Sequence, residues 1–278
     1  MDPSGTCDEA ATATKVSGPS TRADASQPPD DAITVAAAGV LAATLAAVCH
    51  ETVGHGIGCV AAGGQVELLT SIWFRCHGAT SLTDAGGAIA GVIFGALALS
   101  LPLHRMGDAA ARLTLLMFGA ISLLWVAAQL VVHPVFDRDD WHFIALRMHW
   151  PWAWRPLLAV FGALFYAGIV RWIVSLLANS AVPVQAIRLA YVAGAASAAL
   201  AGLMWSPQPV RSAVEGVLTL GVAPLGLLLA VWRVKSRLKH PGRAVITRSW
   251  YFVSISLTVF TAFAVLQGRG IGPLTTLP

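Results

Sequence analysis

Long apolar stretches separated by short polar segments dominate this chain. Several reach the roughly 20 residues that a helix needs to cross the hydrocarbon core of a bilayer. They lack the alternation of polar and apolar positions that indicates transmembrane strands. The pattern predicts an all-α fold, a polytopic transmembrane helix bundle of about seven spans. The predicted spans are Ile33–Ala62, Thr83–Leu103, Leu113–Val132, Ala153–Ala178, Val184–Trp205, Ser212–Trp232 and Trp250–Leu266.

The beginning of the chain differs from the rest. Residues 1–31 are rich in Ser, Thr, Pro, Ala and Asp and show no apolar periodicity, so we expect a disordered acidic tail. No basic segment precedes a short apolar core there, which excludes a cleaved signal peptide. Residues 32–150 are predicted to form a three-span core, and residues 151–278 add four further spans.

Two loops lie on the same predicted side of the membrane. Residues 65–74, between the first two spans, have weak strand character and predict a short hairpin-like surface loop. Residues 133–152, after the third span, are rich in aromatic side chains, which is typical of the membrane interface.

Composition supports the membrane assignment and adds an orientation. The chain is 56% hydrophobic and only 12% charged, whereas soluble domains are about a quarter charged. The net charge of +4 comes from short basic clusters between apolar runs, which excludes a nucleic-acid surface. We expect an integral protein of a bacterial inner (plasma) membrane, embedded in lipid. The positive-inside rule predicts that its N-terminus is cytoplasmic and its C-terminus outside. Of the 18 basic residues, twelve lie on the predicted cytoplasmic side: Lys15, Arg22, Arg105, Arg112, Arg171, Arg188, Arg233, Lys235, Arg237, Lys239, Arg243 and Arg248.

The first span contains an unusual polar group, with His50, Glu51 and His55 close together. Imidazoles and carboxylates inside a membrane helix are costly and indicate a functional site. The zinc-peptidase signature H-E-x-x-H places two histidines on one helical face with the glutamate as general base. Here one extra residue separates the histidines, and five positions on a regular helix turn them about 140° apart. A regular helix therefore cannot bring both rings to one metal ion.

Two interpretations of this spacing remain open. A π-bulge would absorb the extra residue, and Gly54 makes such a distortion less costly. Alternatively, Glu51 and His55 form the ligand pair, four residues apart, and His50 has another role. We favour the bulge because it leaves Glu51 available as a base.

The motif and its surroundings resemble the site-2-protease-type intramembrane zinc metallopeptidases. His50-Glu51-x-x-x-His55 stands late in the first span and is followed by Gly-Gly-Gln-Val at residues 63–66. Members of that family carry a zinc-binding helix, a short surface hairpin and a Gly/Ala-rich second helix, which residues 84–95 resemble. The resemblance covers roughly residues 33–145. It implies a Zn²⁺ site with His50 and His55 as ligands and Glu51 as the general base.

The third metal ligand of that family is an aspartate after a Pro-containing stretch. In this chain Pro134 is followed by Asp139 and Asp140 near the end of the third span. The spacing from Pro134 favours Asp139, and the neighbouring Trp141 favours Asp140. We give a slight preference to Asp140 and keep both as candidates.

Four further residues are candidates for supporting roles. Gln129 and His133, one turn apart, are possible substrate-site residues, although Gln129 is equally suited to hydrogen bonding between helices. Cys59 and Cys76 both lie towards the predicted outer, oxidising side, where a disulfide would attach the hairpin to the first helix.

These features predict a multi-pass zinc metallopeptidase that hydrolyses a peptide or membrane-protein substrate in or next to the bilayer. Two alternatives use the same residues. One is a catalytically inactive relative that acts as a membrane binding or scaffold protein, and the other is a proton or metal-ion transporter.

Overall fold

The computed structural model describes residues 29–137, 139–179, 182–235 and 244–273 of the chain. The predicted acidic tail lies almost entirely outside the described residues. Its last residues are described, and they are anchored: the backbone N–H of Ile246 donates to Asp30 Oδ1 at 3.0 Å, and Arg248 pairs with Asp31 Oδ2 at 2.7 Å.

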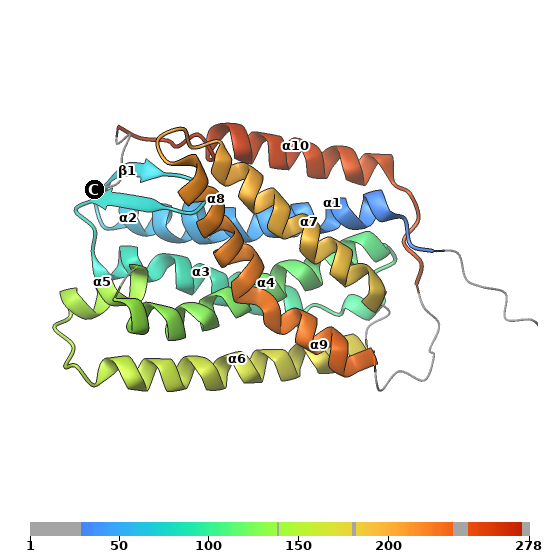
Figure 1. Cartoon of the computed structure of the whole chain (residues 1–278), viewed down its shortest axis with the longest axis horizontal. Coiled ribbons are helices and arrows are strands. Elements are labelled where there is room, and N and C mark those ends of the chain that lie inside the picture. Colours follow the sequence, from blue (N-terminus) through green and yellow to red (C-terminus); the bar gives the residue numbers. More distant parts are fainter. Residues whose placement is uncertain (1–28, 138, 180–181, 236–243, 274–278) are drawn as a thin grey trace, which may run out of the picture.

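The described residues form a bundle of long helices with a two-stranded hairpin at one end (Figure 1). The elements are α1 (Ala32–Ala47), the π-helix η1 (Val48–Gly56), α2 (Ile57–Ala61), β1 (Gln65–Leu69), β2 (Phe74–His77), α3 (Ser81–Ser100), η2 (Leu103–Arg105), α4 (Ala109–Phe136), α5 (Asp139–Arg147), α6 (Trp154–Asn179), α7 (Val184–Leu203), α8 (Pro209–Val217), η3 (Leu218–Val222), η4 (Ala223–Leu225), α9 (Gly226–Lys235) and α10 (Trp250–Leu266).

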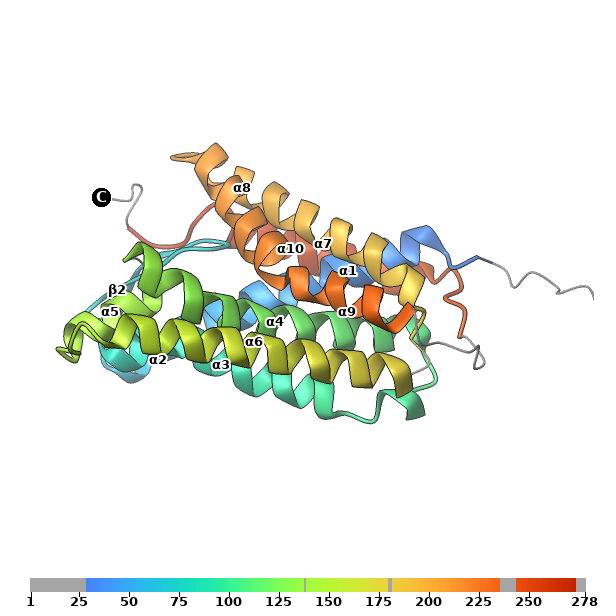
Figure 2. The ribbon, with the colours of Figure 1, turned by 60° about the horizontal axis from the view of Figure 1, so that its bottom comes forward.

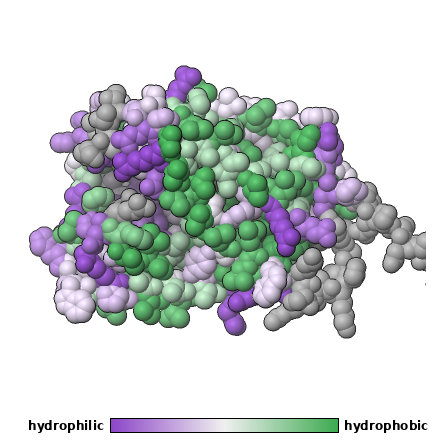
Figure 3. Space-filling model, viewed as in Figure 1, coloured by the Kyte–Doolittle hydropathy of each residue, from purple (hydrophilic) through white to green (hydrophobic). Residues whose placement is uncertain are grey.

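Six helices among the described residues are long and apolar enough to cross a membrane. Two of them are composite: α1, η1 and α2 form one helix over Ala32–Ala61, and α8, η3, η4 and α9 form another over Pro209–Val234. The seventh predicted span coincides with α10, which has 17 residues and is shorter than the other six. Apolar residues gather in the middle of the face seen in Figure 3, and polar residues gather towards its two ends.

Helix α1 lies at the centre and contacts α4, α7 and α10, while α3 packs on η1 and α4. Helix α6 packs on α4 and α9 along another side (Figure 2). Small residues allow the closest of these approaches. A Cβ atom on Gly39 of α1 would lie only 1.8 Å from the carbonyl oxygen of Ala190 on α7.

The end of α4 redirects the chain towards the hairpin end of the bundle. Helix α4 stops after Phe136, and Asp137 adopts a left-handed conformation with φ of 51°. Aspartate is one of the few residues that tolerate this conformation. The following helix, α5, then packs against both α3 and α4.

The predicted hairpin is present and firmly attached. Strands β1 and β2 pair antiparallel, and a disulfide joins Cys59 of α2 to Cys76 of β2. The C-terminal segment adds a bridge on the other edge of β1, where Leu69 and Ile271 exchange two backbone hydrogen bonds of 2.8 Å. The hairpin is therefore fixed to both the first helix and the end of the chain.

The contact between α1 and α7 predicts a specific sensitivity to added volume. We expect Gly39→Ala to destabilise the protein by ~1–3 kcal/mol, because the new methyl group must displace backbone. Gly168→Ala on α6 is the matched control, since nothing lies within 4 Å of a Cβ there. Thermal unfolding in detergent measures both variants, and equal midpoints would contradict the prediction.

Candidate metal centre

The backbone of the first long helix changes its winding at the histidine motif. Residues Val48–Gly56 form a π-helix, in which hydrogen bonds join residues five apart instead of four. His50 and His55 are five residues apart, so this winding brings them onto one face. Their Nε2 atoms lie 3.3 Å from each other, with the rings edge to face at 4.9 Å. The structure thus has a π-helical distortion that absorbs the extra residue between the two histidines, as the first of the two interpretations expected.

Close backbone packing accompanies the π-helix. A Cβ on Gly54 would lie 2.5 Å from Gly87 Cα, and a Cβ on Gly86 would lie 2.3 Å from the Gly54 carbonyl oxygen. The backbones of η1 and α3 are therefore in direct contact. No larger side chain fits at either position without moving one helix away from the other.

Asp140 of α5 is the third member of the group. Its Oδ2 atom lies 3.5 Å from His50 Nε2, and its Oδ1 atom lies 3.4 Å from His55 Nε2. Within the described residues, His50, His55 and Asp140 form the one group of His, Cys, Asp and Glu side chains close enough to hold a metal ion. The side chain of Asp139, the other candidate, lies outside the described part of the structure.

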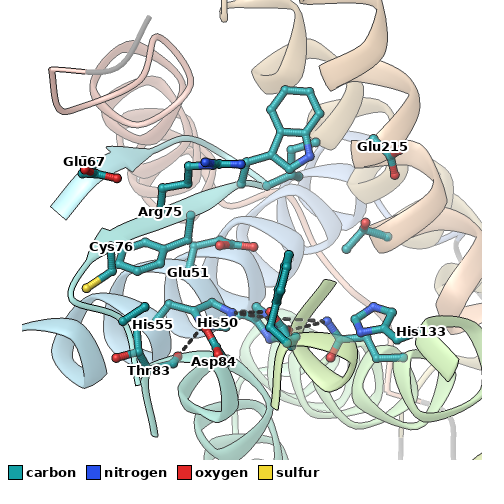
Figure 4. A pocket seen from close by; sticks show the side chains of 18 of the residues that line it. His50, Glu51, His55, Glu67, Arg75, Cys76, Thr83, Asp84, His133 and Glu215 are labelled. Carbon is teal, nitrogen blue, oxygen red and sulfur yellow. Dashed lines mark hydrogen bonds and ion pairs between the residues drawn. The ribbon is translucent and has the colours of Figure 1, made fainter. Parts of the chain in front are cut away.

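Different contacts orient the two imidazoles. His55 Nδ1 lies 2.8 Å from the carbonyl oxygen of Thr83, which accepts a hydrogen bond from it (Figure 4). That bond places a ring proton on Nδ1, so Nε2 is the nitrogen that faces the site and would offer its lone pair to a metal ion. His50 instead stacks on Trp125 of α4, with ring centroids 3.9 Å apart and planes inclined by 24°. Both rings are buried, and both are held by neighbours outside their own helix.

Asp140 is held as an anion by the same groups. Burial alone would raise its pKa, but the positive charge of a protonated His55 and hydrogen bonds from both histidines outweigh burial. The pKa of Asp140 is therefore held well below its usual value. Gln129 of α4 adds a hydrogen bond from Nε2 to Asp140 Oδ2 at 3.2 Å. A metal ion would replace the protons in this role, since it too is a cation that stabilises the carboxylate.

A glycine lets both imidazoles approach the backbone of α3 closely. A Cβ on Gly87 of α3 would lie 2.4 Å from His55 Nε2 and 2.5 Å from His50 Nε2. Any side chain at this position would displace both rings. The two imidazoles can therefore converge here because residue 87 has no side chain.

The donor group opens into a cavity of about 400 Å³. Glu51 lines the cavity beside the histidines, and its carboxylate points into it (Figure 4). Glu51 is only 4% exposed, so its carboxylate is shielded from bulk water. His133, the other predicted substrate-site residue, lines the same cavity from α4.

Several residues that shape the site carry no sequence motif. Trp125, Gln129 and His133 follow at four-residue intervals and share one face of α4, a spacing that could have identified Trp125. Phe74 of β2 stacks on His55 with a centroid distance of 5.5 Å. Thr83 contributes through its backbone carbonyl, which no side-chain pattern reveals.

The close approach of both imidazoles to residue 87 gives a direct test of the candidate metal site. We expect Gly87→Ala to lower zinc affinity by about 10- to 100-fold, because the methyl group displaces the two imidazoles that a metal needs. The fold should survive, since side chains rather than backbone must move. Gly56→Ala on η1 is the control, with its Cβ at 3.7 Å from the Glu51 carbonyl oxygen. Metal analysis and circular dichroism of both variants measure the effect, and equal zinc contents would refute it.

No protein-family model, curated protein or solved structure matches this chain. Its family therefore stays an expectation drawn from the motif. What the structure itself provides is a buried His50, His55 and Asp140 group that could hold a metal ion, next to a carboxylate and a cavity.

Proposed function

We propose that this chain is a multi-pass membrane zinc metallopeptidase that hydrolyses peptide bonds in or next to the bilayer. The observation that carries the proposal is the convergence of His50, His55 and Asp140, whose ligand atoms, one from each residue, lie within 4.8 Å of one another. The two imidazole Nε2 atoms lie 3.3 Å apart, and each has a different oxygen of Asp140 within 3.5 Å. Zinc bonds of about 2.0–2.1 Å in a tetrahedron put neighbouring ligand atoms about 3.3–3.4 Å apart, which is close to the separation of the two imidazole nitrogens.

The chemistry of the donors supports zinc as well. Two imidazoles and one carboxylate are the ligand set of catalytic zinc sites, which keep the fourth position for water or substrate. A zinc ion held here would polarise a peptide carbonyl and make a water molecule more acidic. The cavity of about 400 Å³ beside the donors would give such an ion and its fourth ligand room.

Each polar group around the site then has a defined task. Glu51 accepts the proton of the attacking water and delivers it to the leaving amine. Thr83 and Trp125 keep the imidazoles in place, so that little reorganisation accompanies the reaction. Gln129 donates to Asp140 and holds the carboxylate in the orientation that a ligand needs.

The surroundings favour a substrate that reaches the site from the membrane. A second cavity of about 410 Å³ continues from the first between α4 and the composite helix that begins with α8. The two cavities share Trp125, Gln129, His133, Glu215 and Thr219. We propose the bacterial inner membrane, seven spans and a cytoplasmic N-terminus, as the distribution of basic residues predicts. The peptidase site then lies towards the outer surface.

Zinc binding and cleavage should separate when the site is altered. We expect about one zinc ion per chain in the purified protein and its loss in His55→Ala. Glu51→Gln should keep zinc but lower cleavage of a quenched fluorescent peptide library in nanodiscs by about 10²–10⁴-fold. His104→Ala, an exposed histidine at the opposite end of the bundle, should change neither value.

These measurements, together with an ion-flux assay in liposomes, distinguish the peptidase from a binding protein and from a transporter. Zinc that is retained in His55→Ala would exclude His55 as a ligand. Stoichiometric zinc with no cleavage by the unaltered protein would favour a non-catalytic binding protein. Zinc or proton flux into liposomes that depends on Glu51, again without cleavage, would favour a transporter.

A further inference from the structure

The cavity beside the metal site has two chemically different parts. Towards the hairpin it is lined by charged and aromatic side chains, among them Trp73, Arg75 and Arg211. Towards the composite helix it continues into the second cavity, whose lining is largely apolar. The apolar lining residues are Ala128, Val132, Phe136, Leu218, Val222 and Ala223. A ligand that fills both parts must therefore be apolar at one end and polar at the other.

One arginine of the polar part has no acidic partner among the described residues. Five carboxylates line the cavity. Glu67 lies 3.6 Å from His77, Asp84 lies 2.6 Å from Arg147, and Asp140 contacts the histidines, while Glu51 and Glu215 line other parts of the wall. Arg75 lines the same cavity but makes no hydrogen bond or ion pair with any described residue. Its guanidinium group is thus available to a ligand.

The position of Arg75 is fixed by its neighbours on β2. Phe74 stacks on the metal-site residue His55, and Cys76 is bonded to Cys59. Arg75 itself is paired with Leu68 of β1 and extends into the cavity (Figure 4). Its backbone therefore lies one residue from a side chain in contact with the metal ligands.

A second arginine extends the cationic surface. The guanidinium of Arg211, at the start of α8, lies over the ring of Trp73 at 5.4 Å from its centroid. Its hydrogen bond at 3.0 Å goes to the neutral Oε1 of Gln208, so its charge is not neutralised by that contact. Two guanidinium groups thus line one wall of the cavity.

Resting on the proposed peptidase function, we propose that Arg75, assisted by Arg211, binds a carboxylate of the peptide substrate close to the scissile bond. A guanidinium binds a carboxylate through two parallel hydrogen bonds, a geometry that suits a planar anion. The carboxylate is an Asp or Glu side chain or the free C-terminus of the peptide. The substrate is then a peptide with an apolar segment in the groove between α4 and η3 and an acidic group at the hairpin.

Peptide binding to protein whose cleavage is silenced tests this directly. The probe is a fluorescent apolar peptide in phosphatidylcholine nanodiscs, measured on the zinc-loaded Glu51→Gln protein. Four versions differ at one end: an internal Asp, an internal Asn, a free C-terminal acid and a C-terminal amide. We expect the Asp or the free-acid peptide to bind about tenfold more tightly than its neutral counterpart, and the pair that differs identifies the source of the carboxylate.

Variants of Arg75 connect the preference to this residue. Arg75→Gln should bring the ratio of the affinities for the acidic and the neutral peptide close to one without changing zinc content. Arg75→Lys should retain part of the preference for the acidic peptide. Arg75→Glu should favour a Lys-containing peptide. Arg105→Gln, an exposed arginine of η2 beyond the C-terminal end of α3, is the matched control and should keep the full ratio.

The binding results for Arg75 and the cleavage results can be separated. Equal affinities for all four peptides, or a preference that persists in Arg75→Gln, would overturn the role of Arg75 even if zinc and cleavage are found. Competition by phosphatidylglycerol in place of any peptide preference would assign the arginines to lipid and overturn it as well. An Arg75-dependent preference without cleavage would leave the carboxylate site standing and reject only the peptidase.

Discussion

The convergence of the two imidazoles depends on one backbone feature, the π-helix at Val48–Gly56. In an α-helix, residues five apart point about 140° away from each other, and no rotamer change could bring His50 and His55 together on one ion. The wider winding of the π-helix turns the two side chains towards the same face and leaves their Nε2 atoms 3.3 Å apart. Such windings are rare compared with the α-helix and occur frequently at functional sites. Here the distorted turn is held against α3 by glycine backbones in direct contact, so that packing and winding support each other.

The remaining parts of the site come from segments far apart in the sequence, and each is held independently. Asp140 reaches the histidines because α4 ends in a left-handed Asp137 and α5 turns back against α3. The hairpin is held by a disulfide on one side and by the C-terminal segment on the other. Gln267, just after α10, accepts a hydrogen bond from Thr52 of η1 and donates to the Thr70 carbonyl oxygen. The last helix therefore stabilises both the π-helix and the hairpin.

Hydropathy was sufficient to predict the long helices, because each long apolar run must bury its backbone polar groups in a helix of its own. It did not reveal α5, which lies within the predicted loop of residues 133–152. The histidines, Glu51 and the disulfide cysteines could be identified from the sequence, since polar groups in a span are rare and a pair of outer cysteines is conspicuous. The winding at His50 could only be given as one of two interpretations, because its stability depends on contact with Gly86 and Gly87 of another helix. The contacts of Thr83 and Phe74 with His55 are tertiary contacts between segments whose local sequences are unremarkable for a membrane protein. No local pattern specifies such contacts.

A hydrolytic site inside a helix bundle must satisfy two opposing requirements. Side chains that are 2–4% exposed, such as His50 and His55, experience a low dielectric environment in which charge interactions are strong. The proposed hydrolysis would nevertheless consume water, so the same site would need a polar path to the solvent. The two parts of the cavity suit these two requirements because their linings differ. The charged wall formed by the hairpin can be hydrated, whereas the groove along α4 is apolar and suits a membrane segment. Under the proposed function, the firmly anchored hairpin would be the element that positions water and the polar part of a substrate beside the buried donors.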